Sequence, residues 1–204
     1  MTEPSSNSSG GSAPGPPIEL ADDATLVDLA RTHKEAAETA FRALYERYKD
    51  EVYAFLARLL RDDALAEDVL QEAFFRLWKS LDSFENARSF RGWLYQIARN
   101  AALDAIRVRL KEERLAAEKA KRGPGEAPPS AEGAEREDED ARTRAALSAL
   151  PDETRALLIQ RHGLGMKLGA LAESFSCNER TIRTRLTAAA ALLEKALRPE
   201  GGTT

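Results

Sequence analysis

Apolar residues recur at three- and four-residue steps over much of this chain, the spacing that places side chains on one face of an α-helix. Three such stripes occupy the first half of the sequence: Phe41, Leu44, Tyr45, Tyr48, Val52, Phe55, Leu56, Leu59 and Leu60; Val69, Leu70, Ala73, Phe74, Leu77, Trp78 and Leu81; and Phe90, Trp93, Leu94, Ile97, Ala101 and Ile106. Asp62 and Asp63 precede the second stripe and suit a helix N-terminus. Because no run alternates apolar and polar residues, we predict an all-α fold.

A second group of helical stripes lies near the end of the chain. Two short helices are predicted by Leu147, Leu150, Leu157, Leu158 and Ile159, with Pro151 at the start of the second. A helix-turn-helix unit follows, whose first helix carries Leu168, Leu171, Ala172 and Phe175. The turn consists of Ser176, Cys177 and Asn178. We expect Asn178 to cap the second helix, which carries Ile182 and Leu186.

Composition separates the chain into two folded parts. Residues 1–20 are rich in Ser, Gly and Pro and offer almost nothing to bury, so we expect a disordered tail. Residues 123–140 combine Pro, Gly and acidic residues, which favours a flexible linker. We therefore predict two small helical domains, residues 21–122 and 141–198, with a second disordered tail over residues 199–204.

The charge is unevenly distributed. A formal net charge of −4 argues at first against a nucleic-acid partner. However, residues 21–87 contain 9 Lys and Arg against 15 Asp and Glu, whereas residues 88–122 contain 10 against 4. The predicted first domain therefore has an acidic half and a basic half.

Several functional classes are disfavoured by the sequence. His33, His162 and the single cysteine, Cys177, lie too far apart to form a metal-ligand cluster, and no catalytic spacing is recognisable. We expect no enzyme activity, no catalytic residue, no metal and no cofactor. There is no secretory signal and no stretch of about 20 apolar residues, so we expect a cytoplasmic protein without membrane insertion.

Two segments resemble the extracytoplasmic-function (ECF) group of the sigma-70 family, the smallest RNA polymerase sigma factors, which keep only the second and fourth conserved regions. The first segment is AFRALYERYKDEVYAFLARLLRDDALAEDVLQEAFFRLWKSLDSFENARSFRGWLYQIARNAALDAIR, and the second is LPDETRALLIQRHGLGMKLGALAESFSCNERTIRTRL. Their order, the acidic linker and the total length also agree with the group. The resemblance implies a sigma region 2-like bundle and a sigma region 4-like helix-turn-helix domain.

The resemblance implies core RNA polymerase as a partner. In the family, the helix with the pattern AEDVLQEAFFRLW docks on the clamp helices of the largest subunit, and the second domain rests on the flap. The corresponding polymerase-binding residues are Glu67, Asp68, Gln71 and Glu72. From composition alone the same residues fit a solvated helix face equally well. Family members of this size are usually held inactive by an anti-sigma factor, so a partner of that kind is implied as well.

Promoter DNA is the second implied partner. In the family, the loop after the second stripe and the next helix open the minus-ten element and capture a flipped base, which needs an apolar pocket and an amide. The matching pocket residues are Phe84, Ile97 and Asn100, with Asn86, Ala87 and Arg88 in the capturing loop. The strands would lie beside Arg91, Arg99, Arg107 and Arg109, with Asp104 between them. Without the resemblance, Phe84 and Ile97 would be assigned to the core and the arginines to a solubilising surface.

Minus-thirty-five recognition is implied for the last helix, through Arg180, Thr181, Arg183, Thr184, Arg185 and Thr187. Exposed arginines there suit guanine edges and phosphates in the major groove. The sequence departs from the family over residues 187–190, Thr-Ala-Ala-Ala, where bulky and basic residues are common. It also has Ser176 where the turn favours Gly, which costs about 1 kcal/mol or more if Ser176 is left-handed. We therefore expect the second domain alone to bind its element weakly.

Two other functions stay open on the sequence. A helix-turn-helix regulator that acts without polymerase would not need the aromatic loop around Phe84 or the acidic helix. A sigma-like interaction protein that occupies the polymerase or an anti-sigma factor without melting a promoter fits the departure over residues 187–190.

Overall fold

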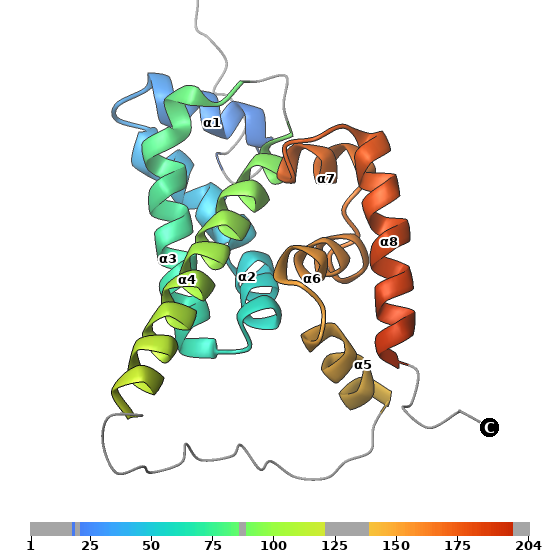
Figure 1. The fold of residues 1–204 in the computed structure, drawn as a ribbon. Helices are drawn as coiled ribbons and strands as arrows, with labels where there is room; N and C mark the ends of the chain where they lie inside the picture. The colour runs from blue at the N-terminus through green and yellow to red at the C-terminus, as the bar shows by residue number, and fades with distance from the viewer. Residues whose placement is uncertain (1–17, 19–20, 86–88, 121–138, 198–204) are drawn as a thin grey trace, which may run out of the picture. The chain divides into compact units, whose positions relative to one another are not determined.

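The computed structural model describes residue 18 and residues 21–85, 89–120 and 139–197 (Figure 1). Within these residues every regular element is helical, which confirms the predicted all-α class. The structure comprises two compact units, Met1–Leu44 and Tyr45–Thr204. The two predicted tails, apart from residue 18, and residues 123–138 of the predicted linker lie outside the described residues.

The first unit contains α1 (Asp23–Thr32) and the beginning of α2 (Ala37–Leu60). Asp22 caps α1, because its side-chain oxygen accepts a hydrogen bond from the Thr25 amide at 2.8 Å. Leu26, Val27 and Ala30 recur on one face of α1 and are buried. The structure thus adds a helix that the apolar stripes did not indicate.

In the second unit, the rest of α2 packs with α3 (Asp63–Ser80) and α4 (Phe90–Ala120). Asp62 caps α3 as expected, since its carboxylate accepts the Leu65 amide at 3.0 Å. Two edge-on aromatic pairs join the three helices: Tyr45 with Phe74, centroids 4.8 Å apart, and Phe55 with Tyr95, centroids 5.4 Å apart. This core positions the 3₁₀ turn η2 (Leu81–Ser83), which follows the end of α3.

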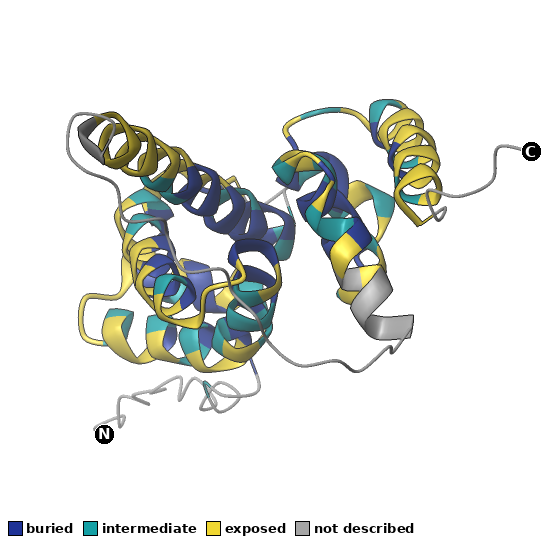
Figure 2. Cartoon of the chain, turned by 60° about the horizontal axis from the view of Figure 1, so that its bottom comes forward, coloured by how far each residue is buried: buried dark blue, intermediate teal, exposed yellow. Residues whose placement is uncertain are grey.

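Two features of α3 and α4 differ from what the apolar stripes in the sequence predict. Trp78 was assigned to the buried stripe of α3 but is 42% exposed. Leu77, the adjacent member of the stripe, is buried, because the two side chains point about 100° apart and the core packs on the side of α3 that carries Leu77. The other difference is that α4 continues to Ala120, well past the last buried position, and its end is exposed to solvent (Figure 2).

The remainder of the second unit is a smaller helical group. It consists of α5 (Glu139–Ser148), α6 (Asp152–Leu158), the π-helical turn η3 (Ile159–Gly163), α7 (Leu168–Ser174) and α8 (Glu179–Leu197). Leu150, Leu158 and Ala189 form a buried cluster that joins α8 to α6 and to the end of α5. A buried hydrogen bond from the Ser174 hydroxyl to the Gln160 side-chain oxygen, at 2.9 Å, fixes α7 against η3.

The predicted helix-turn-helix is present as α7, a turn and α8. Asn178 caps α8 as expected, because its side-chain oxygen accepts the Thr181 amide at 2.8 Å. Ser176 has a φ of +50°, so the turn residue that favours Gly is left-handed here. The arginines in the first two turns of α8 are exposed and lie on the sides of the helix that do not carry the buried Ile182.

Candidate nucleic-acid interface

The predicted base pocket lies where α3 ends and α4 begins. Phe84 is 4% exposed, and its ring centroid is 4.9 Å from that of Trp93 and 5.9 Å from that of Phe90. Ile97 is partly buried on α4, and Asn100 is exposed one turn further along the same helix. In this structure Phe84 belongs to an aromatic cluster, while Asn100 is the pocket residue that is open to solvent.

The predicted capturing loop falls largely outside the described residues. Asn86, Ala87 and Arg88 all lie outside the described residues. What the structure does describe is the start of α4 after them: the Ser89 hydroxyl accepts a hydrogen bond from the Gly92 amide at 3.2 Å. Ser89 therefore acts as the N-terminal cap of α4 and fixes the direction in which that helix leaves the loop.

The residues predicted to contact the minus-ten strands do not all lie on one face of α4. At about 100° per residue, Asp104 and Arg107 share the face of Asn100, and all three are exposed. Arg91 and Arg109 are each nine positions from Asn100, which is two and a half turns, so they lie on the opposite side of the helix. A continuous strip along α4 is therefore made by Asn100, Asp104 and Arg107.

Arg91 and Arg109 are instead directed at neighbouring acidic groups or backbone. Arg91 pairs with Glu51 of α2 and also donates a hydrogen bond to the Leu164 carbonyl at 3.0 Å. Arg109 lies 4.0 Å from the Asp62 carboxylate at the start of α3. These contacts give both arginines a role in joining helices, which the sequence alone did not indicate.

Arg99 is the buried member of the predicted set. Its side chain is 7% exposed, its guanidinium lies 4.2 Å from the centroid of the Phe175 ring, and it donates to the Asn100 side-chain oxygen at 3.1 Å. Burial lowers the pKa of Arg99 from its usual value, since the protein interior disfavours the charged form. The residue predicted to hold a phosphate is thus covered in this structure.

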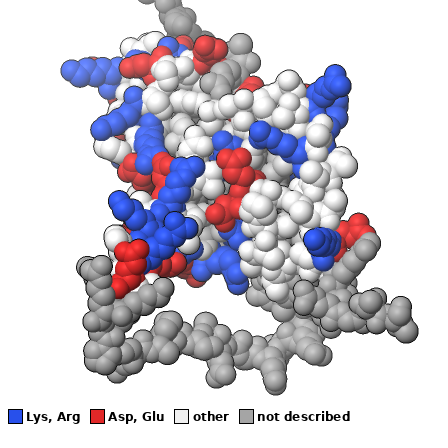
Figure 3. All heavy atoms as spheres, viewed as in Figure 1, with Lys and Arg blue, Asp and Glu red and all other residues white. Residues whose placement is uncertain are grey.

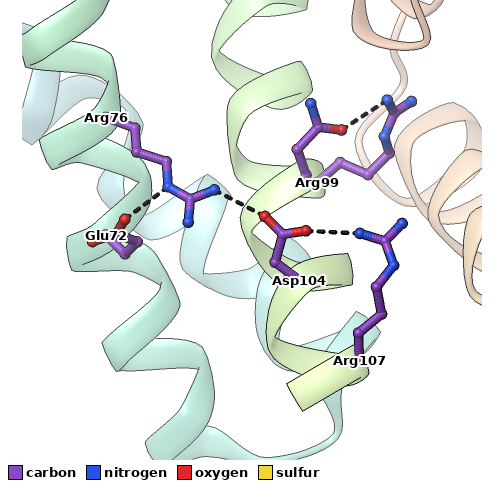
Figure 4. A network of polar contacts seen from close by, with 6 residues as sticks. Glu72, Arg76, Arg99, Asp104 and Arg107 are labelled. Atoms are coloured by element: carbon purple, nitrogen blue, oxygen red, sulfur yellow. Dashed lines mark hydrogen bonds and ion pairs between the residues drawn. The ribbon is translucent and has the colours of Figure 1, made fainter. Parts of the chain in front are cut away.

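A polar network connects the candidate DNA face to α3 (Figure 4). Asp104 accepts from Arg107 at 2.7 Å and from Arg76 at 3.2 Å, and Arg76 also donates to Glu72 at 2.7 Å. Hydrogen bonding to Glu72, followed by that to Asp104, raises the pKa of Arg76. Arg76 was missed by the sequence reasoning, although its spacing of four residues from Glu72 is the usual signal for an ion pair on a helix.

The candidate polymerase-binding face of α3 includes exposed aromatic residues in addition to the predicted charged and polar residues. Glu67, Asp68, Gln71 and Glu72 are all exposed, and Phe75 and Trp78 continue the same side of the helix at 52% and 42% exposure. The Lys79 ammonium lies over the Phe75 ring, 4.2 Å from its centroid. Figure 3 shows how acidic and basic side chains adjoin each other over α3 and α4. This exposed surface combines carboxylates with two large aromatic rings.

The predicted minus-thirty-five residues lie at the start of α8. Arg180, Arg183, Thr184, Arg185 and Thr187 are exposed, whereas Thr181 is partly buried and contributes to the cap at Asn178. Arg183 pairs with Glu179 at 3.2 Å, one turn earlier. Beyond them Ala188 and Ala190 are exposed and Ala189 is buried, so this stretch presents methyl groups and no charge to the outside.

Two other kinds of feature are absent from the described residues. No group of three or more His, Cys, Asp or Glu side chains is arranged to hold a metal ion there. Among the same residues, no helix has both the length and the apolar character needed to cross a membrane.

Comparison with known proteins identifies one region clearly. Residues 44–111 match the model of sigma-70 region 2. The chain is 40% identical over 85 residues to the ECF RNA polymerase sigma factor SigW of Bacillus subtilis, a match that covers 42% of this chain and 46% of SigW. It is 29% identical over 168 residues to the RNA polymerase sigma-H factor of Pseudomonas aeruginosa, covering 78% of this chain and 87% of that protein.

The fold is similar to that of a solved sigma factor. The sigma factor RpoE from Bartonella quintana, solved in complex with the anti-sigma factor NepR, superposes with a TM-score of 0.57 at 22% identity. That superposition covers 79% of this chain and 98% of RpoE. The similarity in fold therefore extends beyond residues 44–111, the region that matches sigma-70 region 2.

Proposed function

Because the chain belongs to the ECF group of the sigma-70 family of RNA polymerase sigma factors, we propose that it binds core RNA polymerase and directs promoter-specific initiation of transcription. The observation that carries this proposal is the match of residues 44–111 to sigma-70 region 2. Those residues include all of α3 and the first two-thirds of α4, whose exposed faces offer a docking surface and a DNA surface. The chain itself performs no catalysis in this proposal, and the polymerase makes the RNA.

The exposed side of α3 docks on the clamp helices of the largest polymerase subunit. Glu67, Asp68, Gln71 and Glu72 provide a charged and polar rim. Phe75 and Trp78, each about half exposed, provide the apolar contact that usually carries the binding energy of an interface. A solvated helix face would not need two exposed aromatic rings, so this pair favours docking over simple solvation.

The Asn100 side of α4 binds the non-template strand of the minus-ten element. Arg107 neutralises a phosphate, Asp104 holds Arg107 in place at 2.7 Å, and the Asn100 amide reads the edge of a flipped base. Phe84 and Ile97, with Asn86, Ala87 and Arg88, complete the pocket when the base enters. Because Phe84 lies within an aromatic cluster, base capture requires its ring or its neighbours to shift.

The start of α8 binds the minus-thirty-five element in the major groove, and the second domain rests on the polymerase flap. Arg180, Arg183 and Arg185 are exposed and reach base edges or phosphates. The two contacts expected at Thr187 and Ala188 are weakened or absent, because neither side chain is charged, so binding by this domain is weak unless polymerase and the minus-ten contact hold it in place.

An anti-sigma factor and a cytoplasmic location complete the proposal. RpoE of Bartonella quintana, which has a similar fold, was solved with an anti-sigma factor, and this supports a partner of the same class. A protein that serves RNA polymerase works where the polymerase works, in the cytoplasm.

A second candidate function is a sigma-like interaction protein that binds polymerase or an anti-sigma factor without melting a promoter. The methyl surface on α8 favours it, because that surface leaves fewer DNA contacts. A regulator acting without polymerase gains no support from the exposed aromatic pair on α3.

Association with core polymerase and promoter opening separate these candidates. The chain is mixed with core polymerase, co-elution is measured, and permanganate footprinting then detects unpaired thymines in promoter fragments. Co-elution with footprints near the minus-ten position is the expected result. Co-elution without footprints favours the interaction protein, and failure to associate with core contradicts the proposed function.

A further inference from the structure

The four arginines of α4 that the sequence assigns to the minus-ten strand do not form one cationic surface. Arg99 is buried, and Arg91 and Arg109 lie on the side of α4 opposite Asn100, which leaves Arg107 as the exposed arginine on the Asn100 side. A single strand carries a phosphate at every nucleotide, so a groove that follows it usually presents several cationic groups. The structure offers a further one on the neighbouring helix α3.

Arg76 of α3 reaches the Asn100 side of α4 through Asp104 (Figure 4). Its Nη1 atom donates to Asp104 Oδ2 at 3.2 Å, and Nη1 of Arg107 donates to the other carboxylate oxygen, Oδ1, at 2.7 Å. The carboxylate therefore lies between two guanidiniums, one from each helix. We propose that Arg76 is a further phosphate-binding residue of the chain, and that Arg76 and Arg107 hold successive phosphates of one single strand. This inference rests on the proposed function, because a strand must first be brought to α4.

Asp104 accounts for the placement of the two arginines. Both side chains are exposed, 42% for Arg76 and 70% for Arg107, and a long exposed side chain loses rotamer freedom when it binds. The ion pairs with Asp104 restrict that freedom before a ligand arrives, which lowers the entropic cost of binding. An acidic residue on a DNA surface repels phosphates by itself. Here one carboxylate faces two guanidiniums, so the three groups together carry one positive charge and attract an anion.

Glu72 holds the Arg76 side chain from the other direction. It lies one turn earlier on α3 and accepts a hydrogen bond from Arg76 Nε at 2.7 Å. Among the described residues, no partner bonds to Nη2 of Arg76 or to Nε and Nη2 of Arg107. Both guanidiniums therefore keep donors for phosphate oxygens. Glu72, which the resemblance assigns to the polymerase, in this way also serves the DNA surface.

The arrangement decides how a strand can lie. Asp104 separates Arg76 from Arg107, so one phosphate could bind both arginines only by displacing the carboxylate. Successive phosphates, one on each side of Asp104, need no such displacement. Arg76 and Phe75 are adjacent on α3 and point about 100° apart, so a strand at Arg76 leaves the aromatic docking face clear. The strand then crosses from α4 toward α3 while polymerase holds α3 from another side.

Arg76→Gln tests the assignment, because glutamine keeps a polar side chain and removes the charge. Binding to a fluorescein-labelled single-stranded oligonucleotide of mixed sequence is measured over a range of salt concentrations, since a phosphate contact carries no sequence information. The full-length chain is used both alone and in complex with core polymerase. Arg42→Gln is the matched control, because Arg42 also pairs with a glutamate one turn earlier, Glu38, at 2.7 Å, but belongs to the other compact unit.

The slope of log affinity against log salt should become shallower by about 0.7 in Arg76→Gln, the value for one phosphate contact on a single strand. It should become shallower by about 1.4 when Arg76→Gln is combined with Arg107→Gln, because two phosphates are then released. Arg76→Lys should restore the slope of the unmodified chain, since lysine retains the charge, and Arg42→Gln should leave that slope unchanged. An arginine that only joined α3 to α4 would affect stability without affecting the slope.

An unchanged slope in Arg76→Gln would overturn the assignment and leave the proposed function intact. Equal changes in Arg76→Gln and Arg42→Gln would also overturn it, because the loss of any positive charge would then have the same effect. Failure of the unmodified chain to bind the oligonucleotide, alone and with core, would remove Arg76 and Arg107 together from strand binding. A slope change confined to Arg76→Gln, without association of the chain with core, would contradict the proposed function and leave Arg76 as a phosphate-binding residue.

Discussion

The guanidinium carbon of Arg99 on α4 lies 4.2 Å from the centroid of the Phe175 ring, directly after α7. The pair joins the helix proposed to bind the minus-ten strand to the domain proposed to bind the minus-thirty-five element. This cation–π contact is one of several that hold α4 against the C-terminal helices, together with the hydrogen bond from the Gln96 amide to the Ser176 hydroxyl at 2.8 Å.

Phe175→Leu should lower the free energy of unfolding by about 0.5–2 kcal/mol, the usual range for a cation–π contact, because leucine keeps the apolar bulk and loses the aromatic face. Urea unfolding followed by circular dichroism measures this loss. Phe175→Tyr retains the ring and serves as the control. Equal free energies of unfolding for the leucine and tyrosine variants would show that the ring face contributes nothing.

Ser176→Gly should be more stable than Ser176→Ala by about 1 kcal/mol. Both variants lose the hydroxyl that accepts the Gln96 amide, but only glycine adopts the φ of +50° without strain. Urea unfolding followed by circular dichroism measures the difference. Equal midpoints for the two variants would mean that the turn relaxes when its side chain changes.

The sequence was sufficient for most of the helical elements and for two of their caps, although it did not indicate α1. Apolar spacing located α2, α3 and the start of α4, and the polar residues Asp62 and Asn178 were correctly identified as helix starts. These features are local, because a cap depends on residues within one turn. The sequence indicated only that Ser176 occupies a turn position that favours Gly, and the structure shows that this residue is left-handed.

The sequence was not sufficient for contacts between distant residues. Leu77 and Trp78 are both apolar, and only the packing of α3 decides that Leu77 is buried and Trp78 exposed. The sequence did not indicate why residue 92 is glycine, because a Cβ there would lie 2.9 Å from the carbonyl oxygen of Ala170, a residue far along the chain. The candidate DNA residues could be assigned only by resemblance, and those assignments stay predictions.

Phe75→Ala combined with Trp78→Ala should weaken binding to core polymerase by tenfold or more, an effect of about 2 kcal/mol that is typical of central aromatic residues at interfaces. Stability should change little, since both rings are about half exposed. Leu115→Ala, at 48% exposure on the end of α4, is the control. Core affinity equal to that of the control would remove the aromatic pair from the docking surface.

Arg107→Gln should weaken binding of the minus-ten oligonucleotide similarly for all sequences. It should also reduce the slope of log affinity against log salt by about 0.7, the value for one phosphate contact on a single strand. Arg183→Gln on α8 is the matched control, because that residue is assigned to the other promoter element. An unchanged salt slope in Arg107→Gln would mean that Arg107 makes no phosphate contact.

The most direct test of the central claim is transcription in vitro by core RNA polymerase, with and without the chain, from fragments of the source genome that include the region upstream of its own gene. Asn100→Ala removes the proposed base-reading amide at an exposed site, and Lys111→Ala changes an exposed residue further along α4 as a control. We expect transcripts that depend on the chain, persist with Lys111→Ala and are strongly reduced with Asn100→Ala. The absence of any chain-dependent transcript, although core binds the chain, would contradict the assignment as a promoter-opening sigma factor.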